Sequence, residues 1–194
     1  MGYKITQKNG GIQINNTINS YDLGSTPLTT VSVKHEQFGP FVKTTLTLDN
    51  VAQSVVNGTE YQGTKIYDFP QCRMLLNGVT ATLQQKTTSA LASTLNAGST
   101  GAIGLGTATA SATTLATTMV DFLPSTAFAS SATVNVAGTA VSAALSASAQ
   151  FDGTSTAKDL YLNTAYATTT DVDGNATQTI SGTIVIVWTN LGDY

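Results

Sequence analysis

Short runs in which apolar or β-branched residues alternate with polar ones recur along the chain from residue 41 onward. A two-residue period of this kind is typical of β-strands that bury one face. The runs that we expect to form strands are residues 41–48, 64–69, 73–76, 79–85, 101–109, 133–141, 159–165 and 179–189. Residues 112–119 fit either a short helix or a strand. The pattern therefore predicts an all-β fold, a β-sandwich or jelly-roll-like domain.

Turn-forming dipeptides separate several of these runs. The Asp-Asn pair at residues 49–50 is expected to end the first strand, and the Asn-Gly pair at 57–58 is a signal that closes hairpins. The second Asn-Gly pair, at residues 77–78, predicts either a hairpin turn or a bulge. Turn signals at this spacing support a fold of short strands.

The last run is apolar on both of its faces. Ile184, Ile186 and Trp188 share one face, and Val185 and Val187 share the other. A strand with two apolar faces is typically a central strand that is covered on both sides, by its own domain or by a partner. We expect residues 66–69 and 184–188 to build the core.

The chain divides by composition into an arm and a domain. Residues 1–40 begin with polar runs and isolated isoleucines, which predicts an extended N-terminal arm with one short strand at most. Residues 41–194 are expected to form a single β-sandwich domain. Its middle, about residues 87–148, is rich in Ala, Ser and Thr, whose small side chains favour close contact between sheets or subunits.

Charge is scarce, and this narrows the function classes. Charged residues make up 10% of the 194 residues, against about 25% in an ordinary soluble domain. The net charge is −3 and the lysines are scattered, so we expect no nucleic-acid partner and no membrane partner. The chain lacks an apolar run long enough to span a bilayer and an apolar segment typical of a signal peptide, so we expect it to be made in a cytoplasm. The single cysteine, Cys72, excludes an internal disulfide.

Residues suited to catalysis or metal binding are few. His35 is the only histidine, and no G-x-S-x-G motif provides a serine nucleophile, so we interpret His35 as a surface or turn residue. Asp171, Asp173 and Asn175 resemble the start of a calcium loop, but the bidentate glutamate that would complete it is missing. An Asp-Gly hairpin turn explains the same residues.

The remaining candidates for chemistry each have a simpler structural explanation. Asp68, Asp152 and Asp159 are the carboxylates that a glycan hydrolase would need, but Asp68 suits a turn before a proline. Cys72 lies among apolar residues, where an inert buried thiol is commoner than a reactive one. The glycines at 101, 104 and 106 lack the spacing of a dinucleotide fingerprint. We therefore predict a protein that is not an enzyme, with no catalytic, cofactor-binding or metal-binding residues and no cofactor.

Four segments carry a resemblance to a known family: TKIYDFPQCRMLLNGVTATL from residue 64, GAIGLGTATAS from 101, FDGTSTAKDLYLNTAY from 151 and GTIVIVWTNLGDY from 182. They resemble the head decoration, or cement, proteins of tailed bacteriophages. The resemblance implies an all-β structural protein of the virion, made in the cytoplasm of a bacterial host. It also implies a homotrimer that binds the outside of the capsid and stabilises the shell by bridging subunits of the major capsid protein.

An alternative function comes from a different class. A tail, head-fibre or adhesin module that binds carbohydrate would need exposed aromatic side chains as a stacking platform. Tyr161, Tyr166 and Tyr194 are the candidates for such a platform.

Overall fold

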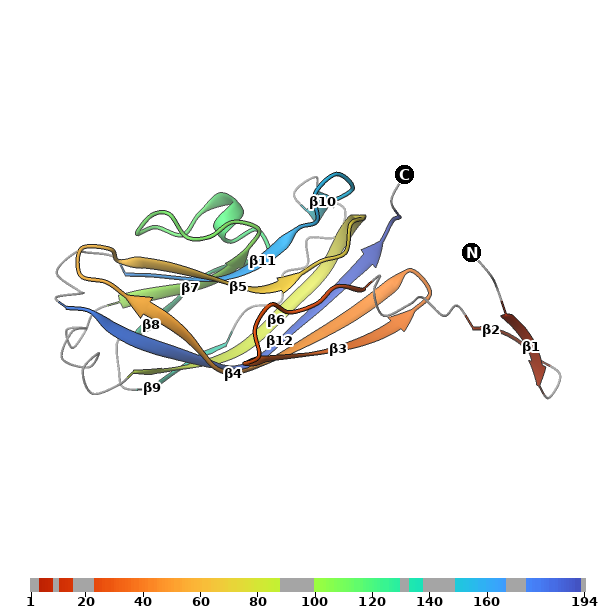
Figure 1. Ribbon diagram of the computed structural model, residues 1–194, viewed down its shortest axis with the longest axis horizontal. Coiled ribbons are helices and arrows are strands. Elements are labelled where there is room, and N and C mark those ends of the chain that lie inside the picture. The colour runs from red at the N-terminus through yellow and green to blue at the C-terminus, as the bar shows by residue number, and fades with distance from the viewer. Residues whose placement is uncertain are drawn as a thin grey trace.

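Two antiparallel β-sheets pack face to face and form a β-sandwich (Figure 1). The structure is a computed structural model that describes residues 4–8, 11–15, 23–87, 100–129, 133–137, 149–166 and 174–192. Within these ranges nearly all residues lie in strands and none lies in an α-helix; the 3-10 turn η2 (Thr117–Met119) interrupts the strands. The predicted all-β sandwich is therefore confirmed.

The two sheets differ in size. The large sheet has the order β10 (Gln150–Asp152), β6 (Arg73–Thr87), β12 (Ala176–Asn190), β4 (Phe41–Val55), β3 (Val31–Phe38), and β9 (Thr133–Ala137) also pairs with β6. The small sheet has the order β5 (Tyr61–Asp68), β11 (Asp159–Tyr166), β7 (Thr100–Gly106), β8 (Leu123–Ala129). β1 (Lys4–Lys8) and β2 (Gly11–Asn15) form a separate antiparallel hairpin.

Strict alternation along the strands places the core between the sheets. On β4, Val42, Thr44, Leu46 and Leu48 are buried, whereas Lys43, Thr45 and Thr47 between them face outward. On β12, Ile184, Ile186 and Trp188 are completely buried, and Trp188 meets Phe69 of the segment after β5 in an edge-on ring contact. Phe69 also contacts Tyr67 and Phe122, so an aromatic cluster fills the centre of the sandwich.

β12 is a central strand, as its apolar pattern predicted, with β4 on one side and β6 on the other. The second apolar face of β12, which we expected to be covered, is partly exposed. Val187 keeps 36% of its surface exposed and Val185 is half-buried. The outer face of the large sheet is thus open at these residues.

The predicted strand end at residues 49–50 is wrong, because β4 runs through it to Val55. Asn50 adopts a positive φ of 55°, and its backbone N–H donates to the hydroxyl of Ser181 on β12 at 2.9 Å. Asp49 and Asn50 oppose that single residue, which makes a β-bulge. A bulge accommodates the turn-forming pair without ending the strand.

The Asn-Gly pair at residues 77–78 makes a bulge as well, which was one of its two predicted outcomes. β6 is continuous, and its register with β12 shifts so that Asn77 has no partner opposite it. The side chain of Asn77 donates to the Thr189 hydroxyl at 2.8 Å. By contrast, Asn57 and Gly58 do form the predicted turn, where Gly58 has a φ of 79°. That turn carries the chain from the large sheet to the small one.

The Ala/Ser/Thr-rich middle forms shorter elements than the pattern suggested. The run at 101–109 forms β7, which ends at Gly106. Only Thr117–Met119 of the run at 112–119 is helical. The run at 133–141 forms β9 as far as Ala137, and its last four residues lie outside the described ranges.

Glycines let residues 107–121 lie flat on the outer face of the small sheet. A Cβ atom on Gly106 would come within 2.2 Å of the Thr118 oxygen, and one on Gly63 would come within 2.2 Å of the Thr109 hydroxyl. The amide of Asn163 on β11 fixes this segment, because its Nδ2 donates to the Met119 oxygen at 2.8 Å and its Oδ1 accepts from the Ala110 N–H at 2.8 Å. The glycines therefore have a packing role.

The N-terminal arm predicted for residues 1–40 is too long. From Leu23 onward the described chain belongs to the sandwich: Leu23 is buried, Ser25 forms a β-bridge with Asp68, and β3 pairs with β4 along its length. The sequence pattern did not reveal β3 as a strand of the sandwich, because an edge strand that buries only part of one face carries few apolar residues.

Two truncations test where the N-terminal arm ends and the β-sandwich domain begins. Deleting residues 1–22 should leave the melting temperature within about 2 °C of the full chain, since it removes no residue of the described core. Deleting residues 1–30 removes Leu23, whose carbonyl accepts the buried Tyr67 hydroxyl, and Leu28, which packs on the core. This deletion should lower the melting temperature by about 10 °C in calorimetry. Equal melting temperatures would show that residues 23–30 do not support the fold.

Candidate functional site

The exposed large apolar side chains of the described residues gather at one end of the large sheet. Phe38 and Phe41 close the β3–β4 turn, Val187 lies near the end of β12, and Leu191 follows that strand. We call these four residues the apolar end. The fifth exposed large apolar residue, Val56, lies in the turn after β4, which is the opposite end of that strand.

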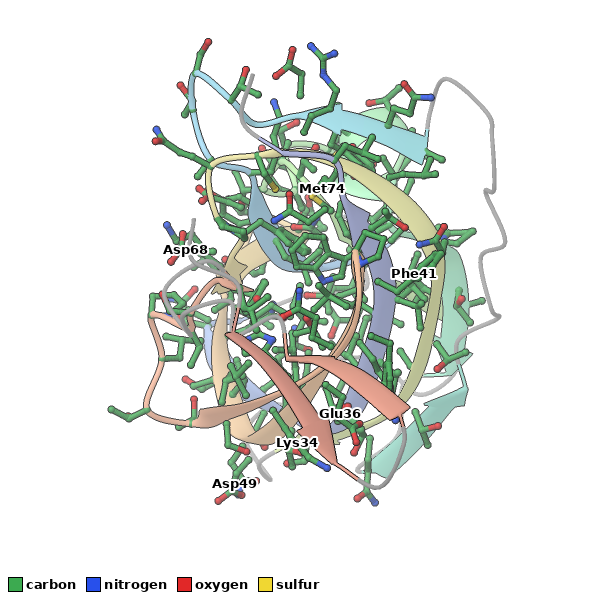
Figure 2. The ribbon with its side chains drawn as sticks, turned by 90° about the vertical axis from the view of Figure 1, so that its right-hand side faces the viewer. Lys34, Glu36, Phe41, Asp49, Asp68 and Met74 are labelled. Atoms are coloured by element: carbon green, nitrogen blue, oxygen red, sulfur yellow. The ribbon has the colours of Figure 1, made fainter. Side chains whose placement is uncertain are left out.

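Strand pairing holds the apolar end together. Phe38 and Phe41 are cross-strand partners, so their side chains lie on the same outer face of the sheet. Val187 pairs with Lys43, which is two residues from Phe41 and faces the same way. Phe38 is 69% exposed and Phe41 is 52% exposed, which leaves two aromatic rings facing solvent at one end. Figure 2 views the molecule from this end and labels Phe41.

A small cluster of charges borders the apolar end. The carboxylate of Glu36 on β3 accepts Lys43 Nζ at 3.0 Å and Lys34 Nζ at 3.3 Å (Figure 2 labels Glu36 and Lys34). Hydrogen bonds from Lys43 and then Lys34, with the charge of both ammonium groups, lower the pKa of Glu36. Beyond this cluster the outer face carries mainly threonine, including Thr47, Thr80 and Thr82. The surface offers contact area with little charge to desolvate.

Behind this face, a buried polar network joins the two sheets. Gln53, Gln85 and Gln178 come from three neighbouring strands of the large sheet, and Thr164 and Tyr166 come from β11 of the small sheet. Gln178 Nε2 donates to the hydroxyl of Thr164 at 2.8 Å, and its Oε1 accepts from the Tyr166 hydroxyl at 2.5 Å. Thr164 donates to Gln53 at 2.8 Å. Burial raises the pKa of Tyr166 to about 12, so the phenol is neutral.

Two further acceptor atoms lie buried in this part of the core. Glu60 Oε1 and Gln85 Oε1 have no hydrogen-bond partner among the described residues. The backbone oxygen of Glu60 accepts from the Tyr166 N–H at 2.7 Å, which places this residue beside the network. Two buried oxygens at this place therefore have no donor among the described residues.

His35 is a strand residue, not the surface or turn residue that we interpreted from its neighbours. It lies in β3 with its ring half-buried, and its Nδ1 is 3.2 Å from the Thr44 hydroxyl. Thr44 also accepts the indole N–H of Trp188 at 3.0 Å. Burial lowers the pKa of His35. The geometry gives His35 a role in packing the sheet edge against the core.

The three candidate carboxylates divide between two places. Asp68 and Asp159 are cross-strand partners on β5 and β11, and Lys65 Nζ bridges them at 2.5 and 3.3 Å. Asp152 lies on β10, where it pairs with Arg73 at 3.2 Å. Hydrogen bonds from the Thr154 hydroxyl and backbone N–H, and then from Arg73, lower its pKa to about 2. Asp152 is thus separate from the other two, which share one lysine.

The tyrosines predicted for a stacking platform also separate. Tyr161 is half-buried and its hydroxyl donates to Asp159 at 3.2 Å, whereas Tyr166 is buried in the polar network. Tyr194 lies outside the described residues. Because Tyr166 has no exposed face, the platform cannot include it.

Cys72 is buried, as predicted for an inert thiol. The calcium-like segment from Asp171 to Asp173 lies outside the described residues. Across the ranges that the structure describes, no cluster of three or more His, Cys, Asp or Glu side chains could hold a metal ion. Those same ranges contain no helix with the length and apolar character needed to cross a membrane.

Comparisons of this chain with protein-family models, with curated proteins and with solved structures found no match. The relation to phage decoration proteins therefore rests on the sequence motifs and stays a prediction.

Proposed function

We propose that this chain is a non-enzymatic structural protein that binds the outer surface of a bacteriophage capsid and stabilises the shell by bridging major capsid subunits. The observation that carries the proposal is the apolar end, where Phe38, Phe41, Val187 and Leu191 face solvent together. Exposed apolar patches of this kind mark protein–protein contacts in soluble proteins. Aromatic residues at such patches supply much of the binding energy of an interface.

The rest of the outer face supports the same proposal. Threonine and serine side chains lose few rotamers when they are buried, so covering them with a partner has a small entropic cost. The sparse charge, 10% of residues, lowers the cost of desolvation as well. The sequence resemblance supplies the identity of the partner, the major capsid protein, and the homotrimeric state.

A trimer would strengthen a modest contact. The three apolar ends of one trimer would bind the shell one after another, and the second and third contacts would form at a high effective concentration. Bound trimers that bridge neighbouring shell subunits would favour the assembled shell by mass action.

The Phe38→Ser/Phe41→Ser double variant tests the proposal. Virions of the phage that encodes the chain should contain wild-type protein in a ratio near one to one with the major capsid protein, measured by quantitative mass spectrometry. The double variant should lose at least about tenfold in occupancy, since it removes both aromatic rings from the contact. Because both side chains face solvent, its thermal unfolding should match that of the wild type.

Val56→Ser provides the matched control. Val56 is exposed and apolar but lies away from the apolar end, so its replacement should leave occupancy unchanged. Equal loss in both variants would assign the effect to general surface apolarity. A few copies per particle would indicate a tail or fibre component, and no copies would overturn the capsid proposal.

A further inference from the structure

β3 is an edge strand of the large sheet. At the opposite side of the sheet, the outer edge of β6 pairs with β10 at residues 73–75 and with β9 at residues 82–86. Among the described residues, β3 pairs with β4 alone. It is eight residues long and contains no proline, so its outer edge presents a continuous row of backbone donors and acceptors. An edge of this kind is a template for another strand.

The register shows which residues face that free edge. The Thr30 oxygen accepts the Asp49 N–H at 2.8 Å, so the backbone groups of Thr30 point toward β4. In an antiparallel pair this direction alternates from residue to residue. The backbone groups of Val33, His35 and Gln37 consequently point away from β4, toward the open edge.

The charges on β3 are complementary to those of a second copy of the same strand. If two copies pair antiparallel about a two-fold axis at His35, Lys34 of each copy lies opposite Glu36 of the other, on the same outer face. An axis at Lys34 or at Glu36 would instead place like charges opposite each other. An axis at Val33 or Gln37 would leave both charged residues facing neutral ones.

We propose that β3 is a homotypic interface, in which two copies of this chain pair antiparallel through their free β3 edges with His35 opposite His35. The pairing joins two large sheets into one continuous sheet. A contact made by one edge is small, so it is weak between free molecules and gains occupancy where copies are concentrated. It depends neither on capsid binding nor on the trimer that the sequence resemblance implies.

Cysteine cross-linking tests the interface and its register together. Lys34 and Glu36 of opposing copies would form a non-hydrogen-bonded pair, with Cα atoms about 4.5 Å apart, a distance that a disulfide spans. Identical positions, 34 with 34 or 36 with 36, would be diagonal neighbours about 7–8 Å apart, which is too far. The Lys34→Cys and Glu36→Cys variants are therefore mixed at up to about 1 mM, air-oxidised and separated on a non-reducing gel.

The expected result is a disulfide dimer that forms several-fold faster in the mixture than with either variant alone, and that contains one chain of each kind by mass spectrometry. Lys43→Cys mixed with Glu36→Cys is the matched control, because Lys43 faces the same way but lies one strand further from the edge. The wild type should not cross-link, since Cys72 is buried. Thermal unfolding of each reduced variant verifies the fold.

Two results would overturn the proposal. One is the absence of mixed dimers at the highest concentration from variants that unfold like the wild type. The other is a yield in the mixture no greater than that of the single variants or of the Lys43→Cys control, which would indicate random collision. Neither result depends on capsid occupancy. The β3 interface can therefore be disproved without disproving the proposed function, and the reverse also holds.

Discussion

Replacing Trp188 by alanine should lower the free energy of unfolding by about 4 kcal/mol, near the top of the range for a single substitution. Trp188 is completely buried between the sheets, where its ring packs edge-on against Phe69 with centroids 5.6 Å apart. Its indole N–H donates to the Thr44 hydroxyl, so the substitution leaves a large cavity and also removes a buried donor from that acceptor. Chemical denaturation followed by circular dichroism measures the change.

The neighbouring residue provides the control for this prediction. Val187→Ala changes a residue of the same strand that faces the open side of the sheet, so it should change stability by less than about 0.5 kcal/mol. A large loss at Val187 would mean that a partner covers the outer face in solution. A small loss at Trp188 would contradict the arrangement of the core.

The second large effect is expected at Gln178, the centre of the polar network. Gln178→Leu keeps the side-chain volume but removes the acceptor of the Tyr166 hydroxyl and the donor to Gln53 and Thr164. A buried hydroxyl without an acceptor costs about 1–3 kcal/mol, and the lost bonds to the other two partners add to this. We expect a loss of about 3 kcal/mol in denaturant unfolding.

Thr177→Leu is the matched control for Gln178→Leu. Thr177 precedes Gln178 on β12, and its side chain is exposed on the opposite face. Its replacement should be nearly neutral. If Gln178→Leu were also neutral or stabilising, apolar packing would serve this part of the core as well as the network does, and the network would not be what joins the sheets.

Local patterns predicted the strands whose alternation is strong. The runs at 159–165 and 179–189 fall within β11 and β12, because apolar residues recur there at every second position. The run at 64–69 matches β5 and Phe69 directly after it, although its buried residues Ile66 and Tyr67 are adjacent. The all-β class follows from these runs and from the absence of a helical period. Local pattern could not decide whether a turn-forming pair ends a strand or forms a bulge within it.

Those pairs depend on strands that are distant in the sequence. Asn50 sits in a bulge because Ser181, 131 residues away, provides the hydroxyl that accepts its N–H. Asn77 sits in a bulge because β12 passes beside it with a shifted register. An Asn-Gly or Asp-Asn pair has the same local preference in a turn and in a bulge, and only the partner strand selects between them.

The apolar end left a signal in the sequence that we did not use. Phe41 lies at an odd position, whereas Leu46 and Leu48 of the same strand lie at even positions, so Phe41 must face away from the core. For Val187 the same alternation was used, and it placed this residue on the face opposite Trp188. That Phe38 pairs with Phe41 could not be predicted without recognising β3, whose polar pattern placed it in the arm. Gln53, Gln85 and Gln178 lie far apart in the chain, so local pattern could not show that they meet.

The position of β12 has a consequence for how the protein is made. β12 follows every other described strand in the chain, yet it lies between β4 and β6 in the middle of the large sheet. A ribosome therefore releases β4 and β6 long before the strand that joins them emerges, and the two must wait with unpaired edges. The scarcity of charge that suits the finished surface offers these nascent strands little protection from pairing with other chains. This topology therefore favours rapid completion of synthesis, or a chaperone that covers the waiting edges.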